Sequence, residues 1–139
     1  MTLLLIRHAR AGDRDDWEGD DLRRPLDDRG RKQAERLVGL LAPYRVDRVV
    51  SSPADRCVQT VEPLARARGL AVEIREELAE ERQAIEGAAF VRSLAANDVA
   101  VSCHGGLSEV LMGVGQKKGE AIVLELQDDR LVVVDRVRA

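Results

Sequence analysis

The stretch LLLIRHARAG, residues 3–12, is the strongest indication of the fold in this sequence. Its four apolar residues predict a strand that is buried on both faces, as the strands of parallel sheets are. The strand ends in Arg7 and His8, two polar side chains at the edge of an apolar run. The chain has only two histidines, and the second, His104, closes another apolar stretch, DVAVSCH. We therefore expect both histidines at the ends of buried strands.

Strand-like and helix-like segments alternate along the rest of the chain. The expected strands are 2–7, 46–52, 71–74 and 98–104 with a final hairpin over 120–137, and the expected helices are 28–42, 53–69, 83–96 and a short one over 105–113. Asp27 or Asp28 caps the first helix, and Ser52 followed by Pro53 begins the second. This alternation predicts an α/β fold, a three-layer α/β/α sandwich whose central sheet is mainly parallel with an antiparallel edge hairpin.

The composition fits one domain of ordinary size over residues 1–139. Hydrophobic residues make up 45% of the sequence and aromatic residues 2%, so the core is aliphatic and there are almost no stacking platforms for single-stranded nucleic acid. A net charge of −3 attracts neither nucleic acid nor an anionic membrane. The N-terminal apolar run is too short for a signal peptide or a membrane span, and two cysteines make no disulfide framework. We expect a cytoplasmic protein that binds neither nucleic acid nor membrane.

The candidate site lies where the strands end. In an open α/β sheet, functional groups gather at the carboxyl ends of the strands. Arg7 and His8 follow the first strand, Arg56 lies in the first turn of the helix after the second strand, and His104 follows the fourth. The sequence therefore predicts two imidazoles and two guanidinium groups at one edge of the sheet.

Phosphoryl transfer is the chemistry that explains this set of side chains. A neutral imidazole is a good nucleophile toward phosphorus and can form a covalent phosphoenzyme. The equatorial oxygens of the migrating group need preorganised positive donors, and arginines supply charge-assisted bidentate hydrogen bonds. A second, protonated histidine and the backbone N–H groups around Gly105 or after Pro53 can add further donors. Such a site requires no metal ion and no other cofactor.

Four blocks of sequence, LIRHA, RPLDDRGRKQA, SSPADRCVQT and SCHGG, resemble in order and spacing the histidine phosphatase superfamily, whose fold is phosphoglycerate mutase-like. The length is most similar to that of the SixA-type phosphohistidine phosphatases. The front half and the ending KKGEAIVLEL…DRLVVVD also resemble histidine-phosphatase domains attached to actinobacterial Nudix hydrolases. The third residue of the opening motif is usually Gly in this family and is Ala9 here, as in many short members.

The resemblance assigns roles to the positions that match the family motifs. His8 matches the nucleophile that becomes phosphohistidine, Arg7 and Arg56 match the phosphate-binding arginines, and His104 matches the second histidine of the pocket. Many members also use a carboxylate as general acid, often in a Leu-x-Glu context. The segment ELAEE offers Glu80 for this role, with Glu77 and Glu81 as alternatives, although SixA-type members use no strong acid at this point.

Other notable residues have simpler interpretations. Cys57 and Cys103 are expected to be small buried core residues, because neither has an arginine six positions later as a cysteine-phosphatase loop would. Lys117 and Lys118 are expected to form a turn, with bordering of the phosphate site as the alternative. The polar segment 10–26, which carries Trp17, reads as a long surface loop, and its aspartates lack the spacing of a Ca²⁺ loop.

These observations predict a metal-independent phosphatase that acts through a phosphohistidine intermediate. Only about eight residues, 75–82, separate the third strand from the next helix, which leaves no room for a lid and favours an open site for a phosphorylated protein side chain. Phosphohistidine proteins are the first expected substrate class, and small phosphoesters or nucleotides are the second. A non-catalytic phosphate-binding module is the alternative of a different class, and retention of both histidines and both arginines weighs against it.

Overall fold

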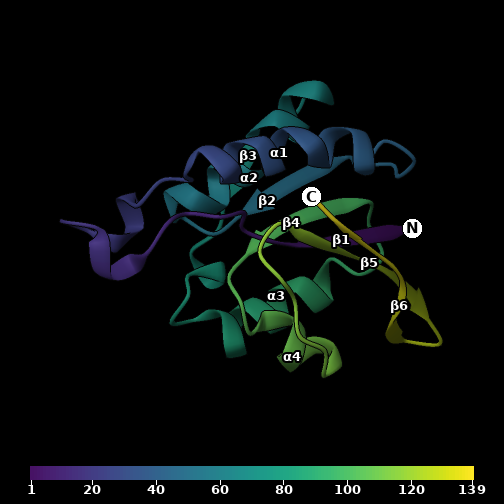
Figure 1. Ribbon diagram of the computed structural model, residues 1–139. Coiled ribbons are helices and arrows are strands. Elements are labelled where there is room, and N and C mark those ends of the chain that lie inside the picture. Colours follow the sequence, from purple (N-terminus) through teal and green to yellow (C-terminus); the bar gives the residue numbers. More distant parts are fainter.

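The computed structural model describes residues 1–139 as a six-stranded sheet with helices on both faces (Figure 1). The strands are β1 (Thr2–Arg7), β2 (Arg48–Ser51), β3 (Val72–Ile74), β4 (Val99–Cys103), β5 (Glu120–Gln127) and β6 (Arg130–Arg138). The helices are α1 (Asp28–Leu40), α2 (Asp55–Ala67), α3 (Ala88–Ser93) and α4 (Leu107–Met112). Helices α1 and α2 cover one face of the sheet and α3 and α4 cover the other, which confirms the three-layer prediction.

The strand order is β3-β2-β4-β1-β5-β6. β3, β2, β4 and β1 run parallel, whereas β5 pairs antiparallel with β1 and β6 pairs antiparallel with β5. The hairpin turn is formed by Asp128 and Asp129, both with positive φ (48° and 63°), as a two-residue turn with primed geometry requires. The mainly parallel sheet with an antiparallel edge hairpin is therefore confirmed.

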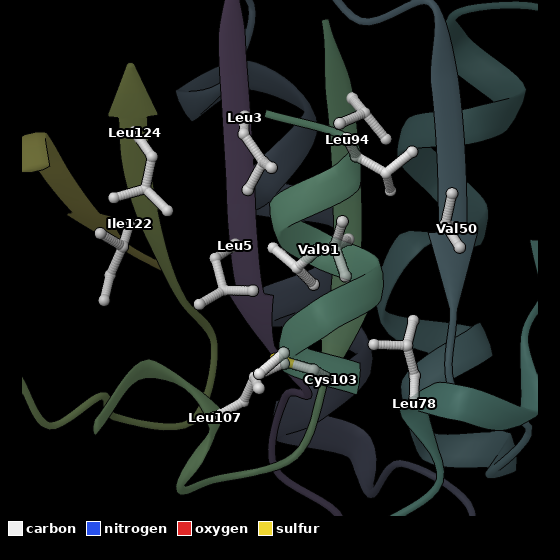
Figure 2. Packing of buried hydrophobic residues seen from close by; sticks show 13 residues of the cluster. Leu3, Leu5, Val50, Leu78, Val91, Leu94, Cys103, Leu107, Ile122 and Leu124 are labelled. Carbon is white, nitrogen blue, oxygen red and sulfur yellow. The ribbon is translucent and has the colours of Figure 1, made fainter. Parts of the chain in front are cut away.

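The core divides into two aliphatic layers because successive strand residues point to opposite faces of the sheet. On β1, Leu3 and Leu5 pack in the layer beneath α3 and α4, and Leu4 and Ile6 pack in the layer beneath α1 and α2. Figure 2 shows the first of these layers, in which Val91 of α3 lies among side chains of the sheet. β1 is thus buried on both faces, as its uninterrupted apolar sequence predicts.

The first helix begins where the sequence predicts, because Asp27 Oδ1 accepts a hydrogen bond from the backbone N–H of Gly30 at 2.8 Å. The second helix begins two residues later than the sequence predicts. It begins at Asp55 with Ala54 as its N-cap and no capping side chain. The Ser52 hydroxyl, expected to cap this helix, is instead 2.8 Å from the ring of His104.

The expected helix over 83–96 is also wrong in its details. A π-helical turn covers Gln83–Gly87, and the α-helix that follows ends at Ser93. The side chain of Gln83, the first residue of the π-helical turn, forms hydrogen bonds with the backbone that follows β4. The predicted loop 10–26 holds two short 3₁₀ turns, Arg14–Asp16 and Asp21–Arg23, and extends beyond the sheet at the left of Figure 1.

Candidate active site

The carboxyl ends of β1, β2 and β4 bring the sequence-predicted residues together. β1 pairs with β4 so that Arg7 is opposite Cys103, and the N–H of His8 donates to the carbonyl of Cys103 at 2.9 Å. The rings of His8 and His104 consequently lie edge to face with their centroids 5.7 Å apart. The two histidines of the chain are therefore adjacent at this edge of the sheet.

His8 is held in one tautomer. Its Nδ1 lies 2.8 Å from the carbonyl oxygen of Ala9, and because a carbonyl only accepts hydrogen bonds, Nδ1 carries the proton and Nε2 keeps a free lone pair. Burial lowers the pKa of His8 to about 3, against a smaller opposing effect of the Ala9 hydrogen bond. The ring is therefore neutral and nucleophilic at neutral pH.

The backbone of Ala9 is fixed in its turn by α2. The N–H of Ala9 donates to the Thr60 hydroxyl at 2.8 Å, and that hydroxyl donates to the carbonyl of Arg56 at 2.7 Å. The Thr60 hydroxyl thus links the backbone of Ala9, the residue after the candidate nucleophile, to the backbone of Arg56 in α2.

His104 is buried and is bonded at both ring nitrogens. Nε2 lies 2.8 Å from Ser52 Oγ, and Nδ1 lies 3.5 Å from Arg56 Nη2. A guanidinium nitrogen only donates, so this contact places the lone pair on Nδ1 and the proton on Nε2. Burial, followed by the charge of Arg56, lowers the pKa of His104 to about 3. In the free protein this ring is therefore neutral, which differs from the protonated second histidine that the sequence predicts as a donor to phosphate.

The two arginines are held by different parts of the chain. Arg56 is 1% exposed; its Nη1 donates to the backbone oxygen of Asp21 at 2.9 Å, and its Nη2 lies 3.2 Å from the Asp21 carboxylate. Arg7 donates from Nη1 to the backbone oxygen of Gln116 at 2.7 Å. The Nε atoms of both arginines are buried without a hydrogen-bond partner. Each guanidinium therefore keeps one N–H donor that no group of the protein accepts from.

Gly105 is needed because the guanidinium of Arg7 passes directly over it. A Cβ at this position would lie 2.8 Å from Arg7 Cζ. The side chain of Gln83 holds the backbone on both sides of His104 and Gly105, because its Oε1 accepts from the His104 N–H at 3.2 Å and its Nε2 donates to the Gly105 oxygen at 2.9 Å. Nothing in the sequence pattern singled out Gln83.

Of the three candidate carboxylates, Glu80 is the one that lines the same cleft as His8. It forms an ion pair with Arg14 at 2.9 Å, and its Oε1 lies 3.6 Å from Arg56 Nη2. Glu77 pairs instead with Arg75 at 2.8 Å, and Glu81 is exposed outside the cleft. The structure therefore separates Glu80 from its two alternatives by position.

The cleft that contains His8 has a volume of about 1170 Å³ and no hydrophobic lining residue. Nine of the residues that line it are cationic and three are carboxylates; the cations are Arg7, Arg10, Arg14, Arg24, Arg29, Lys32, Arg36, Lys118 and Arg138, and the carboxylates are Asp13, Glu80 and Glu109. A protein with a net charge of −3 thus has a strongly positive cleft at its candidate active site. Gly105 also lines the cleft, whereas Arg56 and His104 lie outside its lining and are almost fully buried.

The two cysteines, Lys118 and Trp17 are the remaining residues with a sequence-based expectation. Cys57 and Cys103 are fully buried as expected, but Cys57 Sγ unexpectedly lies 3.6 Å from His104 Nε2. Burial raises the pKa of the Cys57 thiol to about 12, so it remains protonated at neutral pH. Lys118 lies in the expected turn and also borders the cleft. The indole N–H of Trp17 donates to the backbone oxygen of Asp20 at 2.9 Å, and the ring does not line the cleft.

Two further observations concern metals and membranes. No group of three or more His, Cys, Asp or Glu side chains is arranged to hold a metal ion. None of the four helices combines the length and the apolar character that crossing a membrane takes.

Comparison with known proteins identifies the family. The sequence profile of the histidine phosphatase superfamily (branch 1) matches residues 3–92, and the chain belongs to this family. It is 34% identical over 155 residues to the 8-oxo-(d)GTP phosphatase of Mycolicibacterium smegmatis, an alignment that covers 96% of this chain and 47% of that protein. The chain thus spans about half the length of this curated relative.

Solved structures with the same fold include two SixA proteins. A phosphohistidine phosphatase SixA from Agrobacterium tumefaciens has a TM-score of 0.81 and 23% identity, with 99% of this chain and 97% of that chain covered. A protein histidine phosphatase SixA complexed with tungstate has a TM-score of 0.82 and 21% identity over the same shares of the two chains. The mixed sheet and its helical layers are therefore those of the solved histidine phosphatase structures.

The neutral state of the two histidines predicts how stability depends on pH. The pKa of each is about 3 in the folded protein and 6.5 in an unperturbed side chain. Between pH 7 and pH 5 the unfolded chain therefore binds a proton at each histidine that the folded chain does not, and folding weakens by about 2 kcal/mol per ring. Urea unfolding at both pH values should show this loss, reduced by about half in His104→Asn. Equal pH dependence in the variant and the wild-type protein would show that the His104 ring titrates normally.

Proposed function

We propose that this protein hydrolyses phosphoryl compounds through a covalent phosphohistidine at Nε2 of His8. The observation that carries the proposal is the hydrogen bond from His8 Nδ1 to the Ala9 oxygen, which leaves Nε2 unprotonated next to the buried ring of His104. An unprotonated imidazole nitrogen fixed in a positively charged cleft is the nucleophile that this chemistry requires.

In the first step, the lone pair of His8 Nε2 attacks phosphorus in line with the leaving group. The N–P bond forms as the bond from phosphorus to the leaving group breaks, and the leaving group departs with the electron pair. Arg7 and Arg56 supply the positive charge that the equatorial oxygens need. In this proposal the guanidinium groups take the part that metal ions have in other phosphatases, so no metal is needed.

His104 changes protonation state in this scheme. The neutral ring is held by Ser52 and Arg56. A phosphoryl dianion beside the ring favours its charged form, so the ring can take up a proton as substrate binds and donate a hydrogen bond to a phosphoryl oxygen. In the second step, water attacks phosphorus, the N–P bond breaks, and phosphate and neutral His8 are released.

Glu80 is the proposed general acid for the leaving group. Its carboxylate is next to Arg56 Nη2, so a phosphoryl oxygen bound by that guanidinium would lie close to Glu80. The ion pair with Arg14 keeps the carboxylate at the cleft in the free protein. Leaving groups that are stable as anions, or as neutral imidazole, depend little on this residue.

The first proposed substrate class is a protein that carries phosphohistidine. The cleft is open and has no hydrophobic lining residue, which suits a side chain presented on a protein surface better than an enclosed metabolite. The second candidate is a small phosphoester or nucleotide, favoured by the 34% identity to a protein named 8-oxo-(d)GTP phosphatase.

The covalent intermediate can be tested directly. Wild-type protein incubated with a ³²P-labelled phosphohistidine peptide in EDTA should turn over, and rapid quenching should trap label on the protein that is stable to alkali and labile to acid. His8→Ala should lose both the label and turnover by several orders of magnitude, because no other free imidazole nitrogen faces the cleft. Binding of phosphate without turnover in the wild-type protein would identify a phosphate-binding module instead of an enzyme.

The role of Glu80 can be tested with leaving groups of different basicity. Glu80→Gln should lower kcat for phenyl phosphate by about 100-fold and for p-nitrophenyl phosphate only a few-fold, since general acids contribute 10²–10⁴-fold where a proton is needed. Glu77→Gln, in the same loop but paired with Arg75, is the matched control and should leave both rates unchanged. An equal effect of Glu80→Gln on both esters would contradict the assignment.

A further inference from the structure

We propose that three cations on α1, Arg29, Lys32 and Arg36, bind acidic residues that flank the phosphorylated side chain of a substrate protein. We call these three residues the basic stripe. The inference rests on the proposed function, because it assigns a recognition role to the part of the cleft that lies away from His8. It names the feature that would distinguish a cognate phosphoprotein from any other phosphoryl compound.

The basic stripe occupies one face of α1. Its members are three and four residues apart, the spacing that places side chains one above another along a helix. Arg29 and Arg36 are seven positions apart, so a rise of 1.5 Å per residue gives the stripe a length of about 10 Å. All three side chains are exposed and line the same cleft as His8.

No carboxylate of the protein neutralises the basic stripe. Three other cations of the cleft are paired, Arg10 with Asp27 and both Arg14 and Arg24 with Asp21. Arg7, Lys118 and Arg138 also line the cleft without an ion pair, but they do not lie on α1. No ion pair involves a member of the stripe. Like charges three and four residues apart destabilise a helix, so the stripe is unfavourable in the free protein and becomes favourable when anions bind to it.

The basic stripe is held at a fixed offset from the nucleophile. Gln33, within the stripe's span of α1, accepts a hydrogen bond from the backbone N–H of Arg10 at 2.9 Å and donates to the Ala139 oxygen at 3.2 Å. Gly30 allows the backbone of Arg10 to approach the helix, since a Cβ there would lie 1.9 Å from the Arg10 oxygen. Arg10 follows His8 by two residues, so a ligand bound to the stripe reaches the nucleophile at a defined distance.

The form of the stripe favours protein carboxylates over a small oligophosphate. Its charges are spread along a helix face, whereas oligophosphate sites converge donors and backbone N–H groups on one point. The cleft has no hydrophobic residue against which a nucleotide base could pack. Glutamates three or four residues apart on a helix or surface of the partner have the spacing of the stripe, which makes an acidic flank the matching ligand.

The experiment compares two synthetic peptides that carry one phosphohistidine, one with glutamates flanking it and the other with glutamines at the same positions. In the wild-type protein the acidic peptide should have the higher kcat/KM, by about tenfold or more. The double variant Lys32→Gln and Arg36→Gln should lose this preference through a higher KM. The control double variant Arg92→Gln and Arg130→Gln removes the same charge from exposed, unpaired positions outside the cleft and should retain it.

Equal kcat/KM of the wild-type protein for the two peptides would overturn the inference, and so would an equal loss for both peptides in the stripe variant. Competition by tripolyphosphate that depends on the stripe, with no discrimination between the peptides, would assign the stripe to a small oligophosphate instead. Fluorescence anisotropy with the acidic peptide and the His8→Ala protein measures binding without turnover. Stripe-dependent binding with no turnover in the wild-type protein would therefore support the stripe and reject only the catalytic proposal.

Discussion

The parallel pairing of β1 with β4 is the constraint on which the rest of the structure depends. The register that places Arg7 opposite Cys103 also places the next residues, His8 and His104, at neighbouring strand ends. The N–H of His8 completes the pairing by donating to the Cys103 oxygen, so the first residue beyond the strand is still fixed by the sheet. A shift of this register by one residue would turn the side chains of the shifted strand to the opposite face of the sheet and separate the two rings.

Burial and charge act together at this edge of the sheet. Both histidines have a pKa near 3 because they are buried and lie next to arginines, so both rings are neutral in the free protein. The cost of placing Arg56 in the interior is offset by the backbone and carboxylate of Asp21. The loop that carries Asp21 therefore stabilises Arg56 and forms part of the cleft wall.

The sequence was sufficient for the architecture and for the pairing of distant motifs, because buried strands have uninterrupted apolar runs and carboxyl ends of parallel strands share one edge. It could not predict contacts that depend on side-chain direction. Ser52 caps no helix because its hydroxyl meets His104. Gln83 begins a π-helical turn where a regular α-helix was predicted, and its side chain donates a hydrogen bond to the Gly105 oxygen. In the sequence, the residues of the basic stripe look like ordinary surface charges of a helix. That they line the same cleft as His8 is known only from the fold.

The central claim is that Arg7, His8, Arg56 and His104 bind one oxyanion together. A crystal structure of the protein with vanadate or tungstate tests it most directly. We expect the vanadium or tungsten atom to lie next to His8 Nε2, on the line of its lone pair. The oxygens of the oxyanion should be within hydrogen-bond distance of both guanidinium groups and of the His104 ring. An oxyanion that binds only to the basic stripe, with no contact to His8, would contradict it.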